Sequence, residues 1–308
     1  MDVCDFLNPT IIISRLFGLA PFTVVPHKIT GTRGYKISKF WLIYSIILIS
    51  FQILLQITVA YKTNYDQNEV VVTKSTEFVS QISLTIIVFI GIVTVYNSKK
   101  LTIALNKLSL ISLRNSTDKN DPIMKIISLC SASFLIFLMP FSTVFLSYSL
   151  GFQSNSNFFI LLFITNFPSI ILPEILSINI CIVLKDKFKI INLNLDPIKN
   201  SYKYYDHNMN KRQFIKLLSR FHCSLCELAE ELNSVNDAQI TLSVALDCIQ
   251  FTNSLFTDLR VMVFNSMIKS KINQYSAITV WSSLFGVKIT AFLWVCSLVC
   301  FEVSRKYN

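Results

Sequence analysis

Charged residues are missing from several long stretches of this chain, and that clustering constrains the fold more than any other feature. Only 15% of the 308 residues are charged and 52% are hydrophobic, whereas soluble domains usually carry about 25% charged residues. The uncharged windows reach twenty residues or more, which at about 1.5 Å per helical residue is enough to cross a bilayer. The sequence therefore predicts an integral membrane protein.

Six apolar windows qualify as membrane spans, and the fifth is the least apolar of them. Each must be a helix, because hydrocarbon offers no hydrogen-bond partner to a free backbone group. We therefore expect an all-α, multi-pass transmembrane bundle, with kinks where Pro140, Pro168 and Pro173 interrupt spans three and four. The predicted spans are 40–61, 76–97, 126–150, 158–184, 236–264 and 277–301.

The basic residues between these windows predict the orientation of the chain. The N-terminal segment, the connections after spans two and four, and the tail together hold 22 lysines and arginines. The connections after spans one, three and five hold four. The positive-inside rule then places both termini in the cytoplasm. The chain divides into a cytoplasmic segment 1–39, the bundle 40–301 and a tail 302–308. The net charge of +10 follows from this topology, so a nucleic-acid partner is not expected.

The connection 185–235 is long but carries a helical pattern. Apolar residues recur there at steps of three and four, which is typical of one face of an amphipathic helix. No Gly or Pro separates this stretch from span five, so a single helix is expected from about residue 208 to 264. Its apolar face needs a partner, either the same element of other subunits or neighbouring cytosolic helix ends. The face consists of Phe214, Leu217, Leu218, Phe221, Leu225, Leu228 and Leu232.

Enzymatic chemistry finds no support in the sequence. Cys223 and Cys226, with His222 beside them, resemble half of a zinc site. A structural zinc needs four ligands, and no second pair follows at a suitable spacing. The histidines are scattered and there is no glycine-rich phosphate loop. We therefore predict no enzyme activity, no metal and no cofactor.

Ionisable residues inside the apolar windows are more informative. Glu174, Asp247 and Lys288 lie near the middles of spans four, five and six, and Asp258 and Arg260 lie further along span five. Charged groups at membrane depth are costly and are usually paired or face a cavity. Three interpretations stay open: Lys288 forms a buried ion pair with an acid, these groups line a ligand or ion pathway, or the side chains snorkel to the interface or the fifth span is misplaced.

The same topology predicts which residues line the external half of the bundle. Aromatic, hydroxyl and amide groups that converge in a membrane cavity suit a small polar organic ligand, although Tyr148 and Trp281 also fit interfacial anchors. The candidate ligand-binding residues are Ser80, Gln81, Phe141, Thr143, Tyr148, Asn166, Asn253, Asp258, Trp281 and Ser282.

Two stretches resemble insect gustatory receptors. Residues 16–22, Leu-Phe-Gly-Leu-Ala-Pro-Phe, precede a basic segment that ends in Arg33-Gly34-Tyr35, and span one follows. The stretch that leads into span five resembles the cytosolic helix before the fifth span of that family, through His222, Leu225, Leu232, Asn233, Ile240 and Leu242.

The resemblance implies a ligand-gated, non-selective cation channel in the plasma membrane of sensory neurons. It further implies a homo- or hetero-tetramer in contact with lipid, with a tastant bound among spans two to six. In that family a seventh helix with a Thr-Tyr and Gln-Phe signature lines the pore. This sequence has no counterpart before Asn308. We therefore expect a C-terminally truncated receptor that does not conduct by itself and that is retained in the endoplasmic reticulum or forms a closed assembly.

Two other functions are weighed against this one. An insect odorant receptor belongs to the same superfamily, and the opening residues favour the gustatory branch. A small-solute transporter would need broken helices at corresponding places in two halves. Pro168 and Pro173 have no such partners in the second half of the chain.

Overall fold

The computed structural model describes residues 3–26, 33–63, 71–111, 156–200, 211–264, 283, 286–290 and 293–301. The predicted all-α, multi-pass bundle is confirmed, and the predicted third span, 126–150, lies outside the described residues. The elements are α1 (Val3–Leu16), β1 (Phe22–Pro26), β2 (Arg33–Ile37), α2 (Lys39–Thr63), α3 (Val71–Leu110), α5 (Ser156–Asn200) and α6 (Lys211–Phe264). Residues 286–290 and 293–301 are also helical and are called the terminal helix here.

Three described helices are long and apolar enough to cross a membrane. They are Lys39–Thr58 in α2, Gln81–Leu110 in α3 and Pro168–Leu193 in α5, and Gly286–Phe301 is a shorter apolar helix. Only 17% of the α2 window is buried against protein, compared with 78% of the α5 window. Helix α2 therefore lies at the periphery, where its apolar side chains suit lipid, and α5 lies at the centre.

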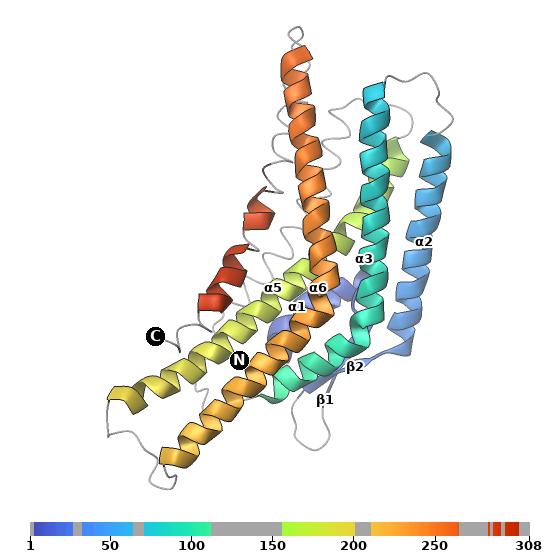
Figure 1. Ribbon diagram of the computed structural model, residues 1–308. Coiled ribbons are helices and arrows are strands. Elements are labelled where there is room, and N and C mark those ends of the chain that lie inside the picture. Colours follow the sequence, from blue (N-terminus) through green and yellow to red (C-terminus); the bar gives the residue numbers. More distant parts are fainter. Residues whose placement is uncertain are drawn as a thin grey trace.

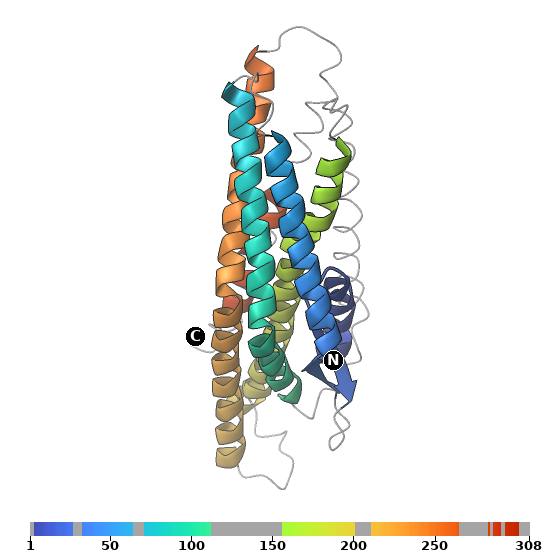
Figure 2. The same cartoon turned by 90° about the vertical axis from the view of Figure 1, so that its right-hand side faces the viewer.

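The helices form an elongated bundle with two distinct ends (Figure 1). Helix α3 packs against α2, α5 and α6, and Figure 2 shows α6 extending over nearly the full length of the molecule beside α3. The end of α2, the start of α3 and the end of α6 share one end of the bundle. The hairpin, the end of α5 and the start of α6 lie toward the other, which is the end predicted to be cytoplasmic.

Helix α1 ends in a Schellman turn at Gly18. The Leu19 N–H donates to the Ser14 carbonyl at 2.8 Å, and the Gly18 N–H donates to the Arg15 carbonyl at 3.0 Å. Gly18 has φ of 72°, a left-handed conformation that glycine adopts without steric cost. The turn also brings the chain against α2, because a Cβ at Gly18 would lie 3.2 Å from Ser45 Cα.

A short antiparallel hairpin, β1 and β2, follows the Schellman turn. The sequence predicted only a cytoplasmic segment in this region and no strands. The outer edge of β2 is held by Asn106 of α3, whose Oδ1 accepts from the Tyr35 N–H at 2.6 Å and whose Nδ2 donates to the Tyr35 carbonyl at 2.9 Å. A strand edge that would otherwise expose backbone groups is thus paired with a side-chain amide.

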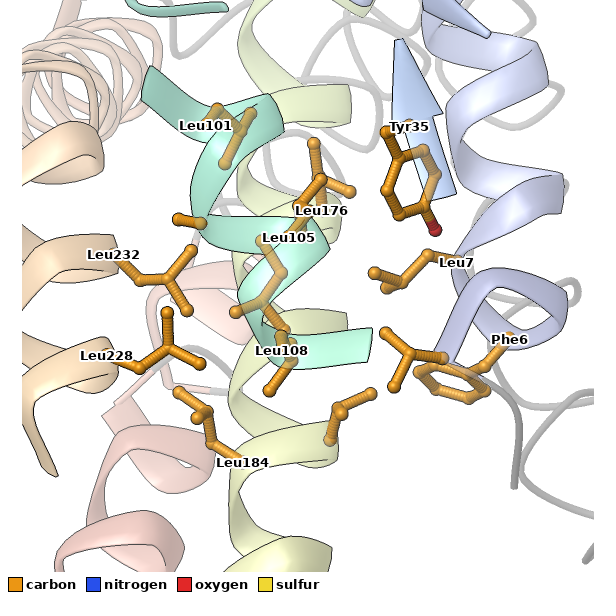
Figure 3. Packing of buried hydrophobic residues seen from close by; sticks show 14 of the residues in the cluster. Phe6, Leu7, Tyr35, Leu101, Leu105, Leu108, Leu176, Leu184, Leu228 and Leu232 are labelled. Atoms are coloured by element: carbon orange, nitrogen blue, oxygen red, sulfur yellow. The ribbon is translucent and has the colours of Figure 1, made fainter. Parts of the chain in front are cut away.

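A large hydrophobic cluster lies at the predicted cytoplasmic end, where α1, α3, α5 and α6 converge (Figure 3). The apolar face predicted for the first part of α6 points into it, so this chain's own helices cover most of that face. Leu217 is 38% exposed, and the side chain of Phe214 lies outside the described residues. The cluster includes Phe6, Leu7, Tyr35, Leu101, Leu105, Leu108, Leu176, Leu184, Leu228 and Leu232.

Helix α5 continues without a break through Pro168 and Pro173 and on to Asn200. The Ser177 hydroxyl donates to the Pro173 carbonyl at 2.9 Å. The axis of α5 changes direction along the length of the helix in Figure 1. The continuation beyond residue 184 places helix where the sequence predicted the start of a connection.

Candidate functional site

Three ionisable side chains from three helices meet inside the bundle. Lys288 of the terminal helix lies with its Nζ 2.9 Å from Oε2 of Glu174 on α5 and 2.8 Å from Oδ1 of Asp247 on α6. The side chains of Lys288, Glu174 and Asp247 are 10%, 9% and 3% exposed. We call these three residues, together with Ser243, the charge cluster.

Ser243 completes the cluster and was missed by the sequence analysis. Its Oγ is hydrogen-bonded to Oε1 of Glu174, and its side chain is buried. Ser243 precedes Asp247 by four residues on α6, and residues four apart share one face of a helix. That spacing is the signal by which Ser243 could have been found.

Apolar and neutral polar residues flank the charge cluster along α5 and α6. Ile170 lies one turn before Glu174, and Leu246 is adjacent to Asp247. Both belong to a second hydrophobic cluster with Leu55, Leu84, Ile87 and Ile90. Nearby, Gln52 Nε2 donates to Ser169 Oγ at 3.2 Å between α2 and α5. In such surroundings electrostatic interactions are stronger than in water, and an unpaired charge is costly.

The cluster can fix the terminal helix to the bundle. Lys288 contacts both α5 and α6 through charge-assisted hydrogen bonds, which are stronger than neutral ones. Much of the terminal helix surface is apolar and exposed, including Val287, Leu293 and Trp294. Lys288 therefore joins the terminal helix to both α5 and α6.

Only part of the predicted ligand-binding set falls within the described side chains. Gln81 on α3 and Asn253 on α6 are both half-buried, and both belong to helix segments nearer the end of the bundle opposite the hairpin (Figure 1). Ser80, Asn166 and Asp258 lie on α3, α5 and α6, but their side chains fall outside the described residues. Phe141, Thr143, Tyr148, Trp281 and Ser282 also lie outside them.

The Cys-Ser-Leu-Cys stretch lies on the first part of α6. The Cys226 Sγ is 3.6 Å from His222 Nδ1, His222 is buried with its ring edge-on to Phe188 at 5.4 Å between centroids, and Cys223 is exposed. Within the described ranges, no three His, Cys, Asp or Glu residues are grouped closely enough to hold a metal ion. The absence of a metal and of a cofactor in the whole chain stays a prediction.

Residues 7–308 match the model of a protein family described as 7tm Chemosensory receptor. No curated protein matches the chain. The match begins within α1 and extends through every other described element, so the hairpin, the cytoplasmic-end cluster and the charge cluster all lie inside it.

Proposed function

The chain belongs to the 7tm chemosensory receptor family, and from this premise we propose that it is a gustatory receptor subunit that forms a ligand-gated, non-selective cation channel. The family is one of membrane receptors rather than enzymes. The gustatory assignment is supported by the residues around Gly18 and Arg33-Gly34-Tyr35, which resemble that branch.

The family match carries the proposal, and the arrangement of the helices supports a ligand-driven mechanism. Helices α3 and α6 run from the predicted external end of the bundle, where Gln81 and Asn253 lie, down to the hydrophobic cluster at the other end. A ligand that binds among these helices at the external end can shift the equilibrium between two arrangements only through contacts that differ between them. The long helices provide a continuous physical connection between the two ends.

We further propose that the ligand is a small polar organic tastant and that the working assembly is a homo- or hetero-tetramer in the plasma membrane of sensory neurons. The external residues Gln81 and Asn253 offer amide donors and acceptors for such a ligand. Ser80, Asn166 and Asp258 lie on the same helices and are proposed as further lining residues.

The test is expression of the full chain, alone and together with related receptor subunits, in cells that lack such receptors. Surface labelling verifies delivery, and whole-cell current is recorded over a panel of sugars and bitter compounds. We expect a ligand-evoked cation current when the chain is expressed together with related subunits, and we expect its half-maximal concentration to rise for Gln81→Leu and Asn253→Leu. The neighbouring Ile82→Ala, on an exposed apolar position, is the matched control. Ligand-dependent solute uptake without current would favour a transporter instead.

A further inference from the structure

The charge cluster contains more negative than positive groups. Glu174 and Asp247 are two carboxyls, and Lys288 is the single ammonium bound between them. If all three were ionised, the cluster would carry one excess negative charge in a nearly closed site. An uncompensated charge at that depth costs several kcal/mol, so the excess charge needs to be neutralised.

No other element packed around the cluster supplies a second positive charge in its described part. The stretches 40–61 of α2 and 81–98 of α3 contain no charged residue, and on the terminal helix Lys288 is the only one between 286 and 301. On α5 and α6 the other charged residues lie at least ten positions from Glu174 and Asp247, about 15 Å along a helix. Arg15 of α1 instead donates to the Phe22 carbonyl and stacks over Trp41.

We propose that the charge cluster is a proton-binding site, in which one proton is bound to Oε1 of Glu174 and shared in a hydrogen bond with Ser243. A hydroxyl oxygen accepts as readily as it donates, so Ser243 can receive this bond. Oε2 of Glu174 remains free to accept from Lys288, and Asp247 is the ionised partner of Lys288. The cluster is then electrically neutral. Glu174 is hydrogen-bonded to Ser243 and Lys288, and Lys288 is also hydrogen-bonded to Asp247.

The bound proton makes the attachment of the terminal helix dependent on pH. The proton comes from water, forms an O–H bond to Glu174 and returns to water when that bond breaks. Its loss leaves two carboxylates facing one ammonium, and the two like charges repel. Alkaline conditions are therefore expected to loosen the terminal helix from α5 and α6. This site stands on charge and geometry alone and does not rest on channel activity.

Infrared spectroscopy of the full chain purified into lipid bilayers tests the proposal, because the C=O stretch of a protonated carboxyl is separate from that of a carboxylate. At neutral pH the spectrum of the wild-type protein minus that of Glu174→Gln is expected to contain a protonated-carboxyl band that shifts in D2O. The matched control Glu230→Gln, on an exposed position of α6, is expected to leave that band in place.

Three further variants distinguish a bound proton from a cluster in which both carboxyls are ionised. Asp247→Asn is expected to abolish the band, because Glu174 then ionises to pair with Lys288. Lys288→Met is expected to intensify the band, because neither carboxyl retains a counter-ion. Ser243→Ala leaves the charge of the cluster unchanged and is expected to shift the band frequency, since Glu174 loses its acceptor.

Two results would overturn the proposal. One is the absence of any protonated-carboxyl band in the wild-type spectrum at neutral pH. The other is a band that appears only after sodium is removed, which would identify a monovalent cation as the neutralising species. If Glu174→Gln does not yield folded protein, an unchanged band frequency in Ser243→Ala would equally refute the assignment of the proton to Glu174.

Discussion

Asn106 binds the backbone of Tyr35 through both ends of its amide group, accepting from the N–H at 2.6 Å and donating to the carbonyl at 2.9 Å across 71 residues of sequence. These two hydrogen bonds join the hairpin to α3. Gly34 makes the approach possible, since a Cβ there would lie 3.0 Å from Asn106 Oδ1.

Asn106→Ala should therefore destabilise the attachment of the hairpin. It leaves a partly buried N–H and carbonyl without this partner, at a cost of about 1–3 kcal/mol. We expect a lower unfolding temperature in detergent and faster tryptic cleavage at Arg33 and Lys36. Lys107→Ala is the control, because its ion pair with Glu231 is exposed on the Lys107 side and worth less than about 1 kcal/mol. Equal behaviour of the two variants would mean that the Asn106 amide contributes little.

Gly18→Ala should be harmful for two separate reasons. The positive φ of Gly18 costs a residue with a Cβ about 1–2 kcal/mol, and the new methyl group would meet Leu48 Cδ1 at 3.1 Å. Gly286→Ala is the matched control, since its nearest neighbour would lie at 4.0 Å. The measurement is the thermal unfolding of both variants, and a Gly18→Ala protein as stable as Gly286→Ala would contradict the close approach of the Gly18 turn to α2.

Lys288→Met should strongly reduce stability and yield. The variant removes the ammonium from two buried carboxyls, and breaking a buried ion pair costs about 3–5 kcal/mol. A second change, Asp247→Asn, should partly restore yield because it removes the carboxylate that Lys288 neutralises. The yield of monodisperse protein after size-exclusion chromatography measures the effect. A double variant as poor as the single one would show that Lys288 acts through packing rather than charge.

The predicted orientation is tested with epitope tags in intact cells. Tags at residues 1 and 308 should be inaccessible to antibody until the membrane is permeabilised, and a tag within 151–157, between the predicted third and fourth spans, should be accessible. The physical reason is the strong bias of lysine and arginine to one set of connections. A tag at residue 308 that is accessible in intact cells would contradict the predicted six-span topology.

The parts of the fold that follow from local periodicity could be predicted. The spacing of Leu225, Leu228 and Leu232 predicts one buried face on a helix from about residue 208 to 264, and α6 is a single helix over Lys211–Phe264. The charge cluster could also be anticipated in part, since each of Glu174, Asp247 and Lys288 interrupts an otherwise apolar window and so needs a partner.

The parts that depend on distant partners could not be predicted. The hairpin edge is satisfied by Asn106, which lies far along the chain from Tyr35, and nothing in the local sequence identifies it. The continuation of α5 past residue 184 was missed because a window chosen for apolar content ends where lysines begin, whereas the helix itself continues. Hydropathy locates the part of a helix that suits lipid and does not locate the end of the helix.

The packing of α1 against α5, which is far away in the sequence, has a consequence for biosynthesis. The Thr10 hydroxyl of α1 accepts a hydrogen bond from the Asn179 amide of α5, 169 residues later. At roughly 5–20 residues per second, the ribosome needs about ten to thirty seconds to make that stretch. During this interval the apolar side chains of Phe6, Leu7 and Ile11 have been synthesised, but their partners on α5 have not. The apolar side chains of α1 therefore lack their α5 partners while α2 and α3 are synthesised.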